Sequence, residues 1–274
     1  MRNFDGKLVF VPGGSSGIGL AVAKQLAERG ARLCLFARRE ETLRAAAAEV
    51  ERRAARPAQV AWWPLDVGDA EAVAAVMRSA IAEHGAPDAL INCAGRAHPD
   101  YFENVSVDRL ADTLRVNLLG CWHTVSAVVP HMKARRSGYI INTSSLAGLI
   151  GLFGYTDYCA SKFALVGFSE ALRDELAPHG VDVSVLCPPD TDTPGFAREN
   201  AGKPPETAAA SEGGGLLSAD QVANELLRGM ARRRFLILPG REAKIAHLAK
   251  RLAPGLVAWV VGRRIRDASK ARTP

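Results

Sequence analysis

The sequence predicts an α/β fold: a doubly wound, parallel, seven-stranded sheet with helices on both faces, followed by a C-terminal helical extension. Two observations predict it. Short apolar runs alternate with helix-like segments seven times, which is typical of parallel sheets whose strands are joined by helices. Small or polar residues follow the ends of most of these runs, at the edge where such sheets bind ligands. We expect residues 1–240 to form one domain and residues 241–274 to form a basic, amphipathic extension.

The elements are expected in strict alternation. The first strand is predicted at Lys7–Val11, and the first helix at Leu20–Arg29, where apolar residues recur at helical spacing. Further strands are predicted at Arg32–Ala37, Val60–Leu65, Ala89–Asn92, Gly138–Thr143, Val181–Cys187 and Phe235–Leu238. Further helices are predicted at Glu41–Arg56, Asp69–His84, Val105–Met132, Tyr158 to about Ala177, and Ala219–Arg233.

Composition and charge narrow the class of protein. With 274 residues, 48% apolar and 23% charged, the chain is that of an ordinary globular protein. We recognise no secretory signal and no membrane-spanning run, so a cytoplasmic location is expected. Five scattered cysteines predict small buried residues and no metal site. Residues 231–274 hold 12 Lys/Arg and 2 Asp/Glu. The basicity therefore belongs to the tail, which favours contact with an anionic membrane over a nucleic-acid-binding core.

A glycine-rich turn, Gly13–Gly19 (GGSSGIG), joins the first strand to the first helix. Glycines let the backbone approach a pyrophosphate at a helix N-terminus, where free N–H groups favour negative charge. A plain tight turn is the alternative, but the strand and helix on either side favour dinucleotide binding. The predicted contacts are Gly13, Ser15, Ser16, Gly17, Ile18 and Gly19.

The end of the second predicted strand bears on the choice of dinucleotide. Ala37-Arg38-Arg39 stands where an acid for a ribose 2′-hydroxyl is common. An arginine would instead pair with a 2′-phosphate, which favours NADPH. Arg38 is the better candidate, and Arg39 is either a second contact or a solvated neighbour. Asp66 is predicted to accept a hydrogen bond from the adenine amine.

The small residues after the fourth strand, Asn92-Cys93-Ala94-Gly95, suit a loop that passes close to a ligand. Asn92, Ala94 and Gly95 are therefore also predicted to contact the cofactor. Asn117 stands among apolar residues in the middle of a predicted helix. A buried amide in such a place needs a polar partner or water.

Tyr158 and Lys162 stand four residues apart, so on a helix they project from the same face. A fixed ammonium favours the phenolate form of a nearby tyrosine, and the pair could exchange a proton with a substrate oxygen. By itself the spacing is weak evidence, since a solvated helix face is the commoner explanation.

Taken together, these residues resemble the short-chain dehydrogenase/reductase family over about residues 5–240. The resemblance rests on GGSSGIG, Asp66-Val67, the Asn92–Gly95 loop, Asn117, and Ser145 thirteen residues before Tyr158 of the Tyr158/Lys162 pair. It implies a Rossmann-type fold and transfer of a hydride from NADPH to a carbonyl carbon. We also expect cofactor contacts at Val67, Pro188 and Thr191.

The resemblance also implies roles for the catalytic residues. Tyr158 would exchange the proton, and Lys162 would lower its pKa and hold the nicotinamide ribose. Ser145 would hydrogen-bond the substrate oxygen, and Asn117 would position a water. Ser144 and Tyr155 are near decoys for the serine and the tyrosine.

Two positions depart from the family pattern. Pro12 replaces the usual Thr before the first glycine, which places the local support of the turn in question. Pro189 replaces the glycine of the usual Pro-Gly that follows the sixth strand.

The segment PPDTDTPGF at residues 188–196, together with Gly151–Gly154, resembles one branch of the family, the 3-ketodihydrosphingosine reductases. This resemblance implies reduction of the 3-keto group of a long-chain sphingoid base. The alternatives are another hydrophobic ketone or a 3-oxoacyl thioester, and a non-catalytic NADP-binding regulator. Residues 190–217 are expected to form a lid loop over the substrate. Its Gly-, Ala-, Pro- and Ser-rich part, Ala197–Leu217, would be either mobile or a floppy insertion.

The tail begins with a predicted amphipathic helix, Arg241–Leu252, which Pro254-Gly255 ends. An apolar run, Leu256–Val261, and a basic cluster follow. This pattern suits a segment that lies in a membrane interface without spanning it. Packing on the body or on a second subunit is the alternative. The family resemblance further implies a homo-oligomer, paired through the helices that carry Asn117 and Tyr158.

Overall fold

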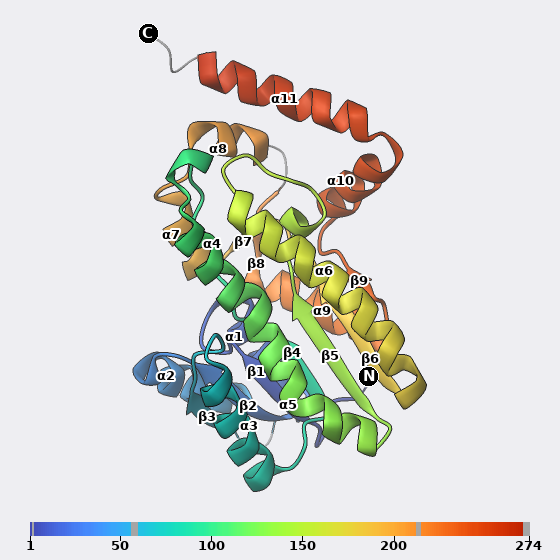
Figure 1. The fold of residues 1–274 in the computed structure, drawn as a ribbon. Coiled ribbons are helices and arrows are strands. Elements are labelled where there is room, and N and C mark those ends of the chain that lie inside the picture. The colour runs from blue at the N-terminus through green and yellow to red at the C-terminus, as the bar shows by residue number, and fades with distance from the viewer. Residues whose placement is uncertain (2, 56–59, 212–214, 271–274) are drawn as a thin grey trace.

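A computed structural model describes residues 1, 3–55, 60–211 and 215–270. Within these ranges a seven-stranded sheet has the order β3-β2-β1-β4-β5-β6-β9, and every strand pair in it is parallel. Its strands are β1 (Leu8–Pro12), β2 (Arg32–Ala37), β3 (Val60–Pro64), β4 (Ala89–Asn92), β5 (Gly138–Thr143), β6 (Val181–Leu186) and β9 (Leu236–Ile237). The predicted doubly wound sheet is confirmed (Figure 1).

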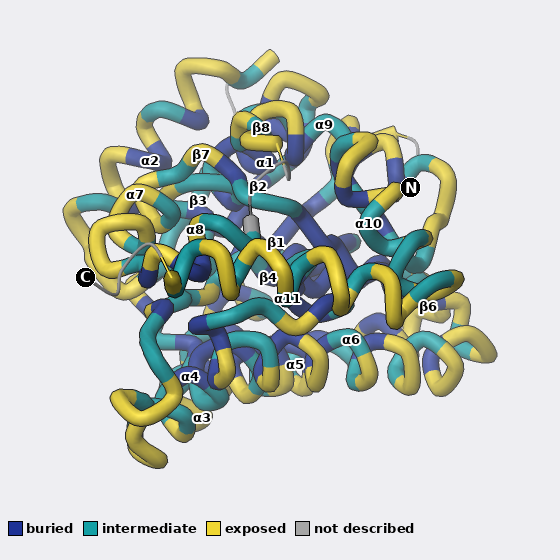
Figure 2. Tube along the Cα trace, turned by 90° about the horizontal axis from the view of Figure 1, so that it is seen from above, coloured by how far each residue is buried: buried dark blue, intermediate teal, exposed yellow. Residues whose placement is uncertain are grey.

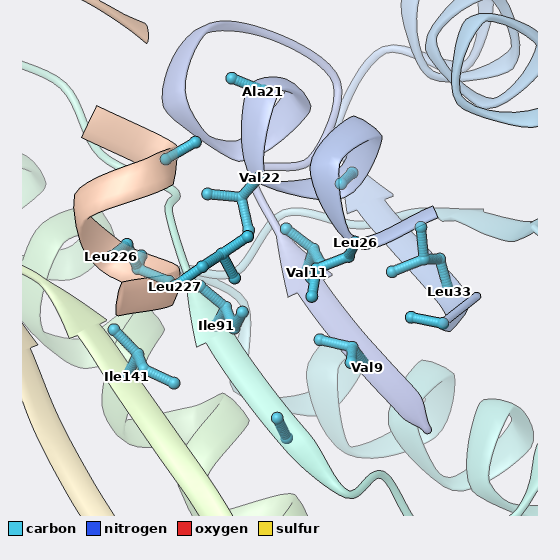
Figure 3. Close-up of a cluster of buried hydrophobic side chains, with 14 of the residues drawn as sticks. Val9, Val11, Ala21, Val22, Leu26, Leu33, Ile91, Ile141, Leu226 and Leu227 are labelled. Atoms are coloured by element: carbon cyan, nitrogen blue, oxygen red, sulfur yellow. The ribbon is translucent and has the colours of Figure 1, made fainter. Parts of the chain in front are cut away.

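Helices cover both faces of this sheet, because side chains along each strand alternate between its two faces. Val9 and Val11 of β1 pack with α1 (Gly17–Ala27), α2 (Glu40–Arg53) and α9 (Ala219–Ala231). Figure 3 shows Val22 of α1 towards Leu227 of α9, and Leu26 of α1 over Val11 and Leu33 of the strands. Leu8 and Phe10 point to the opposite face, against α3 (Ala70–His84), α5 (Gly120–Ala134) and α6 (Thr156–Leu176).

The long helix predicted at Val105–Met132 is interrupted. It consists of α4 (Val107–Leu114), a π-helical turn at Arg115–Leu119, and α5. A π turn inserts one extra residue into the helix and is frequent at functional sites. Asn117 lies in this turn and is fully buried.

The predicted lid loop is largely helical, which corrects the sequence-based expectation. It forms α7 (Pro194–Asn200) and α8 (Pro205–Ser211), and a small parallel pair joins β7 (Thr191–Asp192) to β8 (Leu217–Ser218). The Thr193 hydroxyl accepts a hydrogen bond of 3.1 Å from the Phe196 N–H, and Pro194 follows it. A capping threonine followed by proline is a helix start. Gly213 and Gly214 lie outside the described residues, as does Arg56.

The tail forms two helices, α10 (Arg241–Leu252) and α11 (Pro254–Lys270). The first and its end at Pro254 match the prediction. Figure 1 draws α11 across the top of the molecule beside α8, and the Ser269 hydroxyl donates a hydrogen bond of 3.2 Å to Glu206 of that helix. Among the described helices, none combines the length and the apolar character needed to cross a bilayer.

Candidate active site

A cavity of about 440 Å³ opens at the carboxyl ends of β1, β4, β5 and β6. Twelve of the predicted site residues line it: Gly13, Ser15, Ser16, Gly17, Ile18, Ala94, Gly95, Ser145, Tyr158, Lys162, Pro188 and Thr191. The fold therefore brings together segments that are far apart in the sequence. Seven predicted residues lie outside the lining of this cavity: Gly19, Arg38, Arg39, Asp66, Val67, Asn92 and Asn117.

The glycine turn is shaped so that only glycine fits at two positions. Gly13 has a φ of +83°, and a Cβ there would lie 2.5 Å from the Ala94 nitrogen. A Cβ on Gly19 would lie 2.3 Å from the Gly13 carbonyl oxygen. Ser16 precedes α1 and makes no side-chain cap bond, so the first N–H groups of the helix stay available. This cradle fits the pyrophosphate of a dinucleotide.

Pro12 does not leave the turn unsupported. Its carbonyl oxygen accepts a hydrogen bond of 2.8 Å from the Cys93 N–H, and the Gly13 N–H donates one of 2.7 Å to Phe36. Backbone bonds to both neighbouring strand ends therefore hold the position where a threonine side chain is usual.

Asp66 is held beside two arginines. Its carboxylate accepts hydrogen bonds from the Gly68 N–H (2.9 Å) and from Arg115 (3.2 Å). Burial opposes ionisation, but these bonds and the charges of Arg115 and Arg38 lower the pKa of Asp66. Arg38 itself is exposed at the end of β2, as is Arg39. Arg115 is a neighbour that the sequence reading missed.

Two predicted cofactor contacts have structural partners. Asn92 is buried, donates a hydrogen bond of 2.9 Å to Asn142 and accepts one of 2.8 Å from Thr124. Val67 packs where α5 begins, since a Cβ on Gly120 would lie 2.6 Å from it. Both residues therefore fix the backbone around the cavity, and their contact with the cofactor stays a prediction.

Tyr158 and Lys162 both come from α6 and both line the cavity. The Lys162 ammonium is buried, donates a hydrogen bond of 2.8 Å to the Thr143 carbonyl oxygen and lies 5.6 Å from the centre of the Tyr158 ring. Ser144, the decoy, instead donates a hydrogen bond of 2.9 Å to the Lys162 carbonyl oxygen. Ser145 precedes a short 3₁₀ turn, and its hydroxyl accepts a hydrogen bond of 3.1 Å from the Ala147 N–H.

Asn117 has the polar partners that its burial requires. Its amide oxygen accepts a hydrogen bond of 2.9 Å from the Arg96 N–H, and its amide nitrogen donates to the Arg96 carbonyl (2.9 Å) and to Ser161 (3.0 Å). Ser161 in turn donates to the Tyr158 carbonyl oxygen at 2.7 Å. Asn117 thus ties the loop after β4 to the helix that carries the tyrosine.

The acidity of Tyr158 differs from the sequence-based expectation. Burial raises the pKa of Tyr158, the hydrogen bond with Ser145 lowers it, and the negative charge of Glu199 raises it again. Burial also lowers the pKa of Lys162. The pKa of Tyr158 therefore lies above its ordinary value although the Lys162 ammonium is near, because desolvation of the phenolate is the largest effect on it.

The cavity contains further charged and aromatic groups that the sequence reading did not assign to it. Tyr155, the decoy tyrosine, donates a hydrogen bond to Glu199 of α7, and its ring centre lies 5.6 Å from that of Tyr158. Asp190 also lines the cavity. Burial raises the pKa of both carboxyl groups. The Thr193-Pro194 helix start was the one signal that could have located Glu199.

Comparison with known proteins agrees with this geometry. A family model for short chain dehydrogenases matches residues 7–204. The chain is 44% identical to the 3-dehydrosphinganine reductase of Danio rerio and 41% identical to the 3-ketodihydrosphingosine reductase of Bos taurus, and each match covers 84% of this chain and 70% of the relative.

A solved structure of a short-chain dehydrogenase/reductase from Burkholderia phymatum in complex with NAD matches with a TM-score of 0.79 at 29% identity. That match covers 92% of this chain and 96% of the other. The family match, these relatives and the residues around the cavity agree: the chain belongs to the short-chain dehydrogenase family.

Proposed function

We propose that this protein reduces the 3-keto group of 3-ketodihydrosphingosine with NADPH to give dihydrosphingosine. The observation that carries the proposal is the single cavity in which Ser145, Tyr158 and Lys162 lie at the end of a dinucleotide-type glycine turn. The relatives at 41–44% identity are named as reductases of this ketone. Their names favour 3-ketodihydrosphingosine over other carbonyl substrates.

NADPH would supply the hydride. Residues at the carboxyl ends of the strands would hold the cofactor. The Gly13–Gly19 turn offers N–H groups to the pyrophosphate. The charges of Arg38 and Arg115 both lower the pKa of Asp66, and these two guanidinium groups would neutralise the 2′-phosphate. Lys162 would hold the nicotinamide ribose, with Pro188 and Thr191 beside it in the cavity wall.

Reduction requires a proton for the ketone oxygen, and Tyr158 is suited to provide it. Because burial raises its pKa, the phenol keeps its proton until the substrate oxygen gains negative charge. The buried ammonium of Lys162 then stabilises the phenolate that remains. Ser145 would orient the carbonyl oxygen, since its hydroxyl accepts the Ala147 N–H, and the proton that it shares with Tyr158 could be donated to the substrate oxygen instead.

The test is loss of reduced-nicotinamide absorbance when purified protein is mixed with NADPH and 3-ketodihydrosphingosine. Tyr158→Phe should abolish turnover and keep NADPH affinity, because the ring stays and only the proton donor is lost. Tyr101→Phe is the matched control, since Tyr101 bonds Glu206 outside the cavity lining (2.9 Å) and should remain active. Turnover of a 3-oxoacyl thioester alone would favour the rival enzyme. Tight NADPH binding without turnover of either ketone would favour a regulator.

We further propose that the tail lies on an anionic membrane surface at its cytoplasmic side. Large apolar side chains of α10 and α11 are exposed: Ile245 by 66%, Leu252 by 75% and Trp259 by 57%. Figure 2 draws much of both helices as exposed. Basic residues alternate with these side chains, as in interfacial helices. The alternative, packing on the body, applies to the part of α11 that contacts α8.

Deletion of residues 241–274 should release the protein from vesicles that contain anionic lipid. Leu252→Ser together with Trp259→Ser should weaken the same binding without removing the contact with α8. A deleted protein that still sediments with such vesicles would defeat this proposal.

The third proposal is a homo-oligomer formed through the helices that carry Asn117 and Tyr158. Three large apolar side chains of this region are exposed: Leu119 by 43%, Trp122 by 51% and Phe163 by 43%. A second copy would bury them. Light scattering should give a multiple of the chain mass, and Trp122→Glu should reduce it to that of one chain. A monomeric wild-type protein would contradict it.

A further inference from the structure

One wall of the catalytic cavity carries an acidic side chain with no partner. Asp190 follows β6 through Pro188-Pro189 and lines the cavity together with Tyr158. In the described part of the chain, no group donates a hydrogen bond to its carboxylate, and no cation forms an ion pair with it within 4 Å. A partly buried carboxylate without a counter-charge destabilises the folded protein unless a cationic ligand completes it.

Glu199 stands on the same side of the reacting group. It accepts the hydrogen bond of Tyr155, whose ring neighbours that of Tyr158 at 5.6 Å between centres. The charges of Glu199 and Asp190 both act on the Tyr158 phenol and oppose its ionisation. Because Asp190, Glu199 and Tyr158 line one cavity, the two carboxylates can meet a group next to the reacting carbonyl.

The positively charged side chains near the cavity compensate the negative charge of Asp190 and Glu199 only in part. Lys203 lies over two rings, 5.0 Å from the centre of Phe196 and 5.8 Å from that of Tyr155. Its charge favours ionisation of both carboxyl groups, yet burial still raises the pKa of each. Arg198 of α7 lines the cavity, and its charge acts on His98. In the described part of the chain, neither Lys203 nor Arg198 forms an ion pair with Asp190 or Glu199 within 4 Å.

We propose that Asp190, supported by Glu199, binds the ammonium group of an amino ketone whose carbonyl oxygen is held by Tyr158 and Ser145. This inference rests on the proposed function, because 3-ketodihydrosphingosine carries its amine on the carbon next to the ketone. A 3-oxoacyl thioester has no cation at that position and would leave the carboxylate unpaired, so Asp190 selects between the two candidate substrates. A charge-assisted hydrogen bond of this kind corresponds to roughly a 10- to 100-fold difference in kcat/KM.

The experiment compares 3-ketodihydrosphingosine with the matching ketone that lacks the amine, 1-hydroxyoctadecan-3-one. In the wild-type protein, kcat/KM should be higher for the amino ketone. Asp190→Asn keeps the shape of the side chain and should reduce that preference roughly 10- to 100-fold, mainly through KM. Asp192→Asn, two residues further along the chain on β7, exposed and outside the cavity lining, should keep the wild-type preference.

A second measurement covers the case in which Asp190→Asn fails to fold. Glu199→Gln should reduce the preference in the same direction. Calorimetry should also show that wild-type protein binds dihydrosphingosine more tightly than the corresponding diol without the amine.

The outcomes separate this subsite from the proposed function. If both variants fold, reduce the amino ketone and keep the wild-type preference, the function stands and the subsite is wrong. If the wild-type protein reduces a 3-oxoacyl thioester and not 3-ketodihydrosphingosine, the function fails and the subsite fails with it.

Discussion

Replacement of Asn117 by alanine should lower the free energy of unfolding, although alanine is the better helix-forming residue. Asn117 makes three hydrogen bonds, two with the backbone of Arg96 and one with Ser161, and it is fully buried. Asn117→Ala removes all three at once and leaves the backbone N–H and C=O of Arg96 without this partner. The loop after β4 then loses its tie to the π-helical turn and to α6.

The expected loss can be worked from these bonds. A hydrogen bond in a folded protein contributes roughly 0.5–1.5 kcal/mol net, so three of them correspond to about 3 kcal/mol. For a chain of this size, 1 kcal/mol corresponds to roughly 2–4 °C in Tm, so the melting temperature should fall by about 6–12 °C. Ser161→Ala removes only one of the three bonds and should cost about 1 kcal/mol.

The assay is urea unfolding of wild-type protein and both variants without cofactor, followed by circular dichroism, with the melting temperature as a second readout. The reasoning is wrong if Asn117→Ala lowers the free energy of unfolding no more than Ser161→Ala does. Such a result would mean that the Arg96 backbone finds other partners, and that Asn117 acts on catalysis alone.

Three further outcomes are expected. Arg38→Asp should shift kcat/KM from NADPH towards NADH by roughly 10-fold or more because it replaces attraction of the 2′-phosphate with repulsion; unchanged NADPH selectivity would refute this phosphate site. Gly19→Ala should abolish measurable NADPH binding, since its Cβ would lie 2.3 Å from the Gly13 oxygen, whereas Gly202→Ala meets nothing within 4 Å and should bind normally. Burial raises the pKa of Asp190 in the folded protein. The contribution of Asp190 to the free energy of unfolding is therefore fully present at pH values below its pKa in the unfolded chain. It is lost as the pH rises through its pKa in the folded protein. Asp190→Asn should therefore gain stability relative to wild type in urea titrations from about pH 4 to about pH 7, and a constant difference would contradict that assignment.

The strands and the main helices were predictable because their signals are local. Val9 and Val11 alternate with Leu8 and Phe10 on β1, and a buried parallel strand has to be apolar on both faces. The lid was misread because its composition is rich in small residues, although Thr193 and Pro194 start a helix there. The interruption at Arg115–Leu119 has no comparable signal, since a π turn uses the same apolar spacing as the helix around it.

The site was predictable only in part. Tyr158 and Lys162 are one helical turn apart, so their proximity follows from sequence spacing. The roles of Arg115 and Glu199 depend on how the π-helical turn and α7 meet the strand ends, which no spacing encodes. Ser161 was missed for a similar reason, since its partner Asn117 lies 44 residues away.

The doubly wound fold, the glycine turn and the pair of proton-transfer residues follow from the sequence, because each depends on periodicity or on neighbours within a turn or two of the chain. The electrostatics of the cavity arise only when the chain is folded. Burial makes Tyr158 a weaker acid than its lysine neighbour suggested. Packing of α7 brings Glu199 to the same cavity, and the segment after β6 brings Asp190 there. Desolvation and charge pairing depend on groups that meet only after folding. For this reason the acidity of the side chains that face the substrate could not be derived from the sequence.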